Sequence, residues 1–167
     1  MPGSSHVYAI AVGSNRRGRH GDPRAEVAAA LDALDGLASP IMASAPVGPS
    51  TRTFANAVTL VATDAEPRAL LARLKAMERA AGRRAGRRWG ARVLDLDIVA
   101  WSGGVYGDEA LTIPHVAFRE RAFVLAPLLA IAPHWRDPLT GRTIRQLHAR
   151  LTRPRPGPTA RRAGAGP

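Results

Sequence analysis

The spacing of apolar residues divides the first hundred positions into strands and helices. Four short runs rich in apolar and β-branched residues predict strands: Val7–Val12, Ile41–Ala45, Phe54–Ala62 and Val93–Trp101. The first run ends at the turn residues Gly13-Ser14-Asn15, and the second leads into a loop rich in proline and glycine at 46–50.

Two segments between these runs have apolar residues at helical spacing. Asp22-Pro23 is typical of a helix start, and Ser39-Pro40 breaks the apolar pattern that follows it. Glu66-Pro67 opens a second helix, and Gly82 is a natural end for it. The order β-α-β-β-α-β over residues 7–101 predicts an α+β, ferredoxin-like sheet with its helices packed on one face.

The rest of the chain divides into helices and a polar tail. Apolar spacing predicts helices at 124–131 and 144–151, as a C-terminal extension of the sheet domain. From Thr152 onwards the chain has almost no apolar residue to bury. We therefore expect one folded domain at 1–151 and a disordered basic tail at 152–167.

Composition restricts the class of protein. The chain has 167 residues, of which 46% are hydrophobic and 22% charged, as expected for one soluble globular domain. No apolar run reaches the roughly 18 residues that cross a bilayer, and the first residues do not resemble a secretory signal. The chain contains no cysteine, which excludes a disulfide scaffold and a cysteine nucleophile. These features favour a cytoplasmic protein.

The charge is strongly positive, with 24 basic and 13 acidic residues and a net charge of +11. Such a surplus is typical of proteins that bind polyanions, either nucleic acid or the phosphates of a nucleotide. A general enrichment in arginine, alanine, glycine and proline explains the surplus equally well. The positions of the arginines therefore matter more than their number.

The strongest chemical signal is the segment Leu94-Asp95-Leu96-Asp97-Ile98. On a strand, its apolar residues would enter the core while Asp95 and Asp97 project together from the opposite face. Two neighbouring carboxylates repel each other, and a divalent cation such as Mg²⁺ would relieve that repulsion. A solvated polar strand face is the alternative, because aspartates two residues apart are common.

The flanking residues favour phosphate binding. Five arginines precede the pair: Arg83, Arg84, Arg87, Arg88 and Arg92. Arginine binds phosphate oxygens bidentately, so arginines beside an acidic pair suit a nucleoside triphosphate. Trp89 either stacks on a flat ligand or covers the core. Downstream, His115 would donate to a phosphate, act as an acid–base group, or be structural.

The first loop imitates part of a phosphate-binding P-loop, because Gly13 and Gly18 have the required separation. Arg19-His20 stands where that motif has lysine followed by serine or threonine. Both the phosphate-binding lysine and the metal-binding hydroxyl are therefore missing. We interpret residues 13–20 as an ordinary loop.

Six motifs occur in order along the chain: Gly13-Ser14-Asn15, Phe54-x-Asn56-Ala57, Glu78-x-x-x-Gly82-Arg83, Arg88-Trp89-Gly90-x-Arg92-x-Leu94-Asp95-Leu96-Asp97-Ile98, Leu111-Thr112-x-Pro114-His115 and Arg121-x-Phe123-Val124-Leu125-x-Pro127-Leu128. Together they resemble the 6-hydroxymethyl-7,8-dihydropterin pyrophosphokinases of folate biosynthesis, from about Val7 to Leu147. The resemblance implies transfer of the β,γ-diphosphate of magnesium ATP to the hydroxymethyl group of a reduced pterin, leaving AMP.

The resemblance also implies residue roles. Asp95 and Asp97 would hold two Mg²⁺ ions, and Arg83, Arg92 and His115 would join them in catalysis. The ATP site would comprise Glu78, Arg83, Arg88, Arg92, the backbone of Ile98, Thr112, His115 and Arg121. The pterin pocket would comprise Ser44, Val47, Phe54, Asn56, Trp89 and Phe123. We expect a monomer with no membrane or specific nucleic-acid partner.

The sequence departs from the family pattern at several positions. Ser44-Ala45-Pro46-Val47-Gly48-Pro49 replaces a common Thr-Pro-Pro-Leu-Gly-Pro, and Phe54 replaces a common tyrosine. Ala85 or Gly86 falls where a second loop arginine is usual, so Arg84 or Arg87 would substitute for it. Ala110 stands where a basic residue is frequent. These departures affect expected ATP contacts of the loops, rather than the reaction.

Two other functions deserve comparison. A ferredoxin-like nucleic-acid-binding module would suit the charge, but only 5% of the residues are aromatic and aspartates occupy the strand 93–101. A metal-dependent phosphodiesterase would need further acidic or histidine ligands, which the motifs do not supply. The pyrophosphokinase interpretation accounts for more of the residues than either.

Overall fold

The computed structural model describes residues 5–44, 53–82 and 92–157. Its strands are β1 (His6–Ser14), β2 (Leu37–Ala38), β3 (Met42–Ser44), β4 (Phe54–Thr63), β5 (Asp95–Trp101), β6 (Tyr106–Gly107) and β7 (Thr112–Ile113). Its helices are α1 (Pro23–Leu34), α2 (Pro67–Ala80), the 3₁₀ helix η1 (Phe118–Glu120), α3 (Ala122–Ile131) and α4 (Ile144–Thr152).

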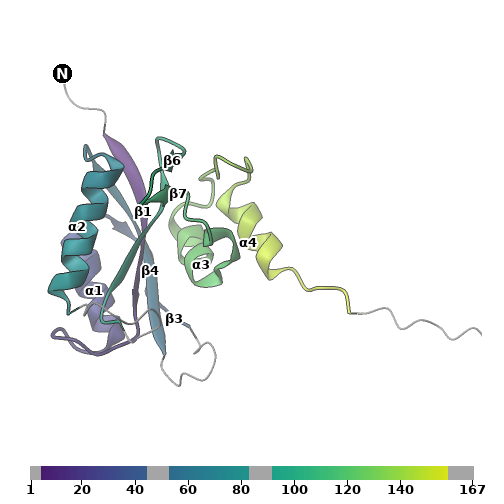
Figure 1. Ribbon diagram of the computed structural model, residues 1–167. Coiled ribbons are helices and arrows are strands. Elements are labelled where there is room, and N and C mark those ends of the chain that lie inside the picture. The colour runs from purple at the N-terminus through teal and green to yellow at the C-terminus, as the bar shows by residue number, and fades with distance from the viewer. Residues whose placement is uncertain (1–4, 45–52, 83–91, 158–167) are drawn as a thin grey trace, which may run out of the picture.

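The main sheet is antiparallel and has the order β2-β4-β1-β5, with β3 also paired to β4. The central pair is β1 and β4, and β5 lies at an edge (Figure 1). With β2 and β3 acting together as the second strand, this is the ferredoxin-like arrangement that the sequence predicts. The predicted α+β class is therefore confirmed.

The predicted helix starts are also confirmed. Asp22 caps α1 by accepting a hydrogen bond of 2.9 Å from the N–H of Ala25, and Pro23 is the first helical residue. α1 ends at Leu34, earlier than the Ser39-Pro40 break, because Asp35 adopts a left-handed conformation with φ of 52°. Because α1 ends early, the chain can form β2 before the break. Both residues of β2 are exposed, so no alternation of apolar and polar residues marks it as a strand in the sequence.

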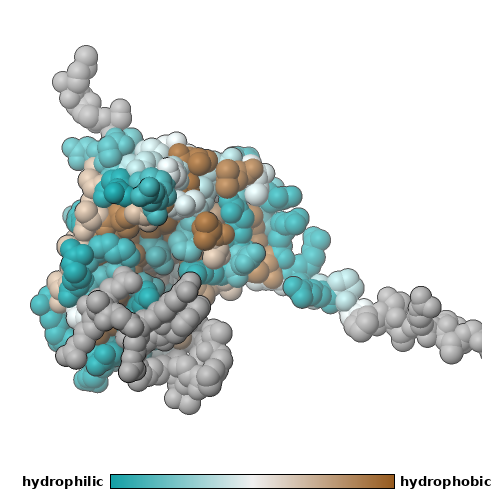
Figure 2. All heavy atoms as spheres, in the orientation of Figure 1, coloured by the Kyte–Doolittle hydropathy of each residue, from teal (hydrophilic) through white to brown (hydrophobic). Residues whose placement is uncertain are grey.

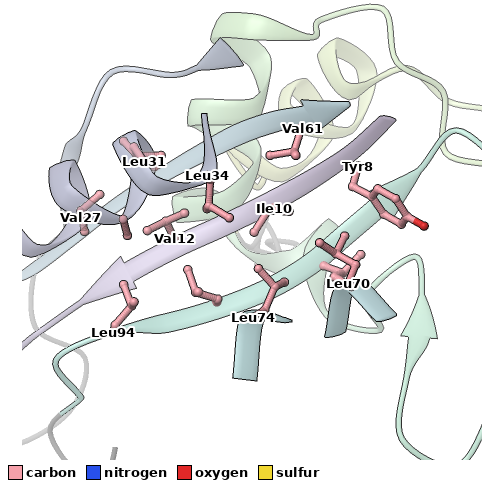
Figure 3. Close-up of a cluster of buried hydrophobic side chains, with 14 of the residues drawn as sticks. Tyr8, Ile10, Val12, Val27, Leu31, Leu34, Val61, Leu70, Leu74 and Leu94 are labelled. Carbon is pink, nitrogen blue, oxygen red and sulfur yellow. The ribbon is translucent and has the colours of Figure 1, made fainter. Parts of the chain in front are cut away.

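The helices cover both faces of the sheet (Figure 1). α1 and α2 bury one cluster against β1, β4 and β5 (Figure 3), which includes Tyr8, Ile10, Val12, Val27, Leu31, Leu70, Leu74, Leu94 and Leu96. The C-terminal extension, α3 and α4, buries a second cluster on the opposite face, which includes Ala9, Val58, Val99, Val124, Leu125, Leu128, Ile144 and Leu147. The extension thus adds a third layer to the fold.

The segment after β5 forms a small hairpin, in which β6 pairs with β7. Asp108 closes the connection, because its carboxylate accepts hydrogen bonds from the N–H groups of Ala110 and Leu111 and from the hydroxyl of Tyr106. This hairpin leads the chain back from β5 to His115.

The last helix includes the residue at which the sequence predicts the tail to begin. α4 ends at Thr152, whose hydroxyl donates to the carbonyl oxygen of His148. Residues 153–157 are exposed and have no regular structure. The rest of the predicted tail, 158–167, lies outside the described residues. Across the described segments, no helix is long and apolar enough to cross a membrane.

Candidate active site

The two aspartates of β5 lie on one face of the sheet. Asp95 lies opposite Gly13 of β1, and Asp97 lies opposite Ala11. The alternate residues are buried in the first core cluster: Leu94, Leu96 and Ile98. Strand periodicity therefore separates the apolar and acidic residues as predicted, and it leaves only the backbone of Ile98 for the expected contact with ATP.

The aspartates and the neighbouring charges affect one another strongly. Burial raises the pKa of Asp97 above its ordinary value, and the charge of Asp95 raises it further. The positive charges of Lys75, Arg121 and protonated His115 have the opposite effect. A raised pKa means that the ionised pair is held at an electrostatic cost, which an additional cation would reduce.

Arg92 joins this group at the beginning of β5. Its Nη1 donates a hydrogen bond of 2.9 Å to Oδ1 of Asp95. The two side chains remain 32% and 38% exposed, so the ion pair is open to solvent. A guanidinium group in this position can bind an anion beside the aspartates while it still contacts Asp95.

His115 approaches from the segment between β7 and α3. Its backbone N–H donates to the carbonyl oxygen of Val99, and its ring Nδ1 accepts a hydrogen bond of 3.1 Å from the N–H of Ala117. Because a backbone N–H can donate only to an unprotonated ring nitrogen, neutral His115 carries its proton on Nε2. Burial lowers the pKa of His115, which favours this neutral form.

The start of α3 contributes two further predicted residues. Arg121 precedes α3, and its guanidinium carbon lies 5.6 Å from the ring centre of Phe123. Phe123, in the first turn of the helix, is 42% exposed, which is unusual for so large an apolar ring and suits a contact with a flat ligand. Thr112 is exposed in β7.

The expected pterin-binding residues of β4 lie across the same face. Asn56 pairs with Gly13, which in turn pairs with Asp95, so the three residues form one row across the sheet. The strands of Asn56 and Asp95 are therefore about 10 Å apart. A β-carbon on Gly13 would lie 3.2 Å from Oδ1 of Asn56, so glycine keeps this floor flat. Phe54 lies two residues before Asn56, opposite Ser44 in β3.

Glu78 has a different environment from the other predicted residues. It lies on α2, is fully buried, and accepts a hydrogen bond of 2.9 Å from the N–H of Leu96. Lys75 donates to the other carboxylate oxygen at 3.3 Å. The sequence motifs assign no role to Lys75. Its position one helical turn before Glu78 nevertheless predicts an ion pair between the two side chains.

Several predicted residues lie outside the described residues: Val47, Arg83, Arg84, Arg87, Arg88 and Trp89. Within the described segments, no group of three or more histidine, aspartate or glutamate side chains is arranged to hold a metal ion. Among the described residues, the two carboxylates of β5 are the acidic groups that lie together on this face.

On this sheet, two carboxylates lie together beside arginine and histidine side chains. Such an arrangement of charged groups is typical of enzymes that transfer phosphoryl groups. The chain belongs to the 7,8-dihydro-6-hydroxymethylpterin-pyrophosphokinase (HPPK) family, whose sequence model matches residues 9–133. The family that the motifs resemble is therefore confirmed.

Individual relatives agree with this membership. The chain is 38% identical over 151 residues to the 2-amino-4-hydroxy-6-hydroxymethyldihydropteridine pyrophosphokinase of Pseudomonas aeruginosa, covering 86% of this chain and 90% of the relative. The enzyme of the same name from Haemophilus influenzae is 38% identical over 131 residues, covering 74% and 79%. The Plasmodium falciparum HPPK-DHPS crystal structure with pteroate has a similar fold, with a TM-score of 0.69 at 13% identity, over 88% of this chain and 44% of that one.

Proposed function

We propose that the face formed by β1, β4 and β5 carries out the reaction of this family, in the folate pathway. The β,γ-diphosphate of ATP passes to the hydroxymethyl group of 6-hydroxymethyl-7,8-dihydropterin, and AMP is the second product. The observation that supports this role most directly is the pair Asp95 and Asp97, set on one face of an edge strand beside Arg92, His115 and Arg121. Nothing in the fold or the comparisons favours a nucleic-acid-binding module.

Asp95 and Asp97 fit magnesium. They present hard oxygen ligands, and the raised pKa of Asp97 marks a negative charge that lacks full compensation. With only two carboxylates from the described chain, the remaining ligands would come from phosphate oxygens and water, as Mg²⁺ prefers. When bound, Mg²⁺ neutralises phosphate charge and orients the reacting oxygens. The family resemblance predicts two such ions.

The basic residues around the pair would bind the phosphates of ATP. Arg92, which donates to Asp95, and Arg121, whose charge acts on Asp97, supply permanent positive charge near the aspartates. Neutral His115 would donate from Nε2 to a phosphate oxygen, since its Nδ1 is occupied by the N–H of Ala117. In this role His115 acts as a fixed hydrogen-bond donor, and it does not need to change its protonation state.

The pterin would lie on the flat floor around Gly13. Asn56, at the other end of the row from Asp95, would read the polar edge of the ring, and Phe123 would pack against one face. In this position, the hydroxymethyl group would face the aspartates. The family resemblance assigns Trp89 to the other face and places Ser44, Val47 and Phe54 around the pocket.

The test is a coupled assay for AMP release with purified protein. We expect AMP to form only when magnesium ATP and 6-hydroxymethyl-7,8-dihydropterin are both present. Release of AMP without the pterin, or no release with both substrates, would overturn the proposed reaction. Size-exclusion chromatography and cell fractionation would test the monomeric state and cytoplasmic location that the sequence predicts.

A further inference from the structure

The loop after β1 makes two hydrogen bonds to the backbone of Arg92, three residues before β5 begins. Oδ1 of Asn15 accepts a hydrogen bond of 2.6 Å from the N–H of Arg92, and the N–H of Asn15 donates to the carbonyl oxygen of Arg92 at 3.1 Å. A single asparagine therefore holds both backbone polar groups of Arg92. The two residues are 77 positions apart in the sequence.

This loop is itself held in place. Gly18 and Gly21 exchange backbone hydrogen bonds of 3.0 and 3.3 Å, which close the loop. The buried carboxylate of Glu26 in α1 accepts from the backbone N–H of His20 at 2.6 Å. Asn15 therefore projects from a segment anchored at both ends, by β1 and by α1.

The loop also contacts the residue after Arg92. A β-carbon on Gly18 would lie 2.5 Å from Cγ1 of Val93 and 2.5 Å from a carboxylate oxygen of Glu26. The backbone of Gly18 is thus in close contact with Val93, which only glycine permits. Gly18, which resembles a P-loop glycine in the sequence, thus allows the loop to pack against Val93.

The consequence concerns the guanidinium group of Arg92. An arginine side chain has many rotamers, and its position depends on where the backbone places its first atoms. Asn15 holds the backbone of Arg92, and Asp95 holds Nη1 at 2.9 Å. Both the backbone of Arg92 and its Nη1 therefore have hydrogen-bonding partners within the protein before any phosphate binds.

We propose that Asn15 is a positioning residue for pyrophosphoryl transfer, which acts by holding the backbone of Arg92 so that its guanidinium stays directed at Asp95 and the phosphates. This inference rests on the proposed function of Arg92. Asn15 itself would touch neither substrate. Its contribution is preorganisation, since a misplacement of about 1 Å in such a group can cost about 10²-fold in rate.

The kinetic test compares Asn15→Ala, Asn15→Asp and, as a control in the same loop, the exposed Arg17→Ala. We expect Asn15→Ala to lower kcat by about 10- to 100-fold with little change in the KM for the pterin. Asn15→Asp retains the accepting oxygen and should recover most of the rate. Arg17→Ala should match the wild type. Normal kcat in Asn15→Ala would overturn the inference.

A double-mutant cycle separates positioning from a general effect on the fold. If Asn15 acts through Arg92, the Asn15→Ala change should have no further effect on kcat in an Arg92→Ala background. Additive losses in the double variant would contradict the inference. An inactive wild-type protein would instead count against the proposed function.

A measurement without substrates tests the geometry directly. The short hydrogen bond should give the Arg92 amide a downfield proton shift and slow hydrogen exchange in the wild type and in Asn15→Asp. Both signatures should disappear in Asn15→Ala, while the amides of β1 keep theirs. An unchanged Arg92 amide in Asn15→Ala would show that Asn15 does not hold it, whatever the kinetics.

Discussion

The N–H of Leu96 donates a hydrogen bond of 2.9 Å to the buried carboxylate of Glu78. Leu96 lies between Asp95 and Asp97, and β1 is the only strand that pairs with β5 in the described part of the chain. A helix side chain therefore satisfies a polar group on the open edge of β5. Glu78 thereby also fixes the part of the backbone that carries both aspartates.

This relationship predicts the effect of changing Glu78. Glu78→Ala should lower the free energy of unfolding by about 1–3 kcal/mol, because the N–H of Leu96 would be buried without an acceptor. Urea unfolding followed by circular dichroism measures this change. Glu78→Gln keeps an accepting oxygen and serves as the matched control. Equal losses in the two variants would mean that the hydrogen bond to Leu96 is not what matters.

Removal of the Asp97 charge should change stability and activity in opposite directions. The folded protein raises the pKa of Asp97, through burial and the charge of Asp95, so the folded state binds this proton more tightly than the unfolded state does. The stability that comes with the protonated carboxyl is lost as the pH rises through that raised pKa. At neutral pH without magnesium, Asp97→Asn should therefore raise Tm, while kcat falls by at least about 10²-fold.

Exposed Asp32 on α1 supplies the control for this charge change. Asp32→Asn should leave both Tm and kcat close to their wild-type values. A lower Tm in Asp97→Asn would contradict the electrostatic strain inferred for the pair. Near-normal turnover in the same variant would remove Asp97 from the proposed magnesium site.

An ion pair between the buried carboxylate of Asp137 and the half-buried Arg119 predicts sensitivity to acid. Arg119 donates to both carboxylate oxygens of Asp137, at 2.6 and 2.7 Å, and the hydroxyl of Thr140 donates at 2.6 Å. Burial alone would raise the pKa of Asp137, but these hydrogen bonds outweigh it and lower the pKa to about 2. The lowered pKa means that ionised Asp137 adds about 2 kcal/mol to the free energy of unfolding. This stabilisation is present at pH values above the pKa that Asp137 has in the unfolded chain.

That contribution should disappear as the pH falls from about 4 to about 2, because the carboxylate becomes protonated over this interval. Urea titrations at a series of pH values measure it. In Asp137→Asn the free energy of unfolding should be lower at pH 7 and should fall less steeply with acid than in the wild type. The same steepness in both proteins would exclude Asp137 as the source.

The ion pair also bears on the site, because Arg119 lies between His115 and Arg121 on the segment that leads into α3.

Deletion of residues 154–167 should leave the C-terminal layer intact, since the described part, 154–157, is exposed. We expect an unchanged Tm and kcat, and elution from heparin at lower salt, because basic residues are lost. A clear fall in Tm would show that the tail packs against the domain.

Large apolar side chains are scattered over the described surface of the protein. The face shown in Figure 2 is mostly hydrophilic, with separate apolar side chains among the polar ones. Exposed large apolar residues are few within the described segments, and Phe123 is the one among them that the site explains. Single exposed apolar residues of this kind are common and need no partner.

Local patterns in the sequence determined much of this protein. The period of two in Leu94-Asp95-Leu96-Asp97-Ile98 separates core from site, because consecutive side chains on a strand must point to opposite faces. Asp22-Pro23 set the start of α1, because the cap and the fixed φ of proline act within one turn. The motifs sufficed to identify the family.

Tertiary structure decided the remaining relationships, because they join residues that are distant in the chain. Asn56, Gly13 and Asp95 form one row only through the registers of two strand pairs. The placement of α3 on the second face brings His115 and Arg121 close enough to affect the pKa of Asp97. Asn15 meets Arg92 through two hydrogen bonds, and Glu78 meets Leu96 through one, and no local periodicity could reveal these partners. Such contacts depend on how the layers pack, which local propensity does not encode.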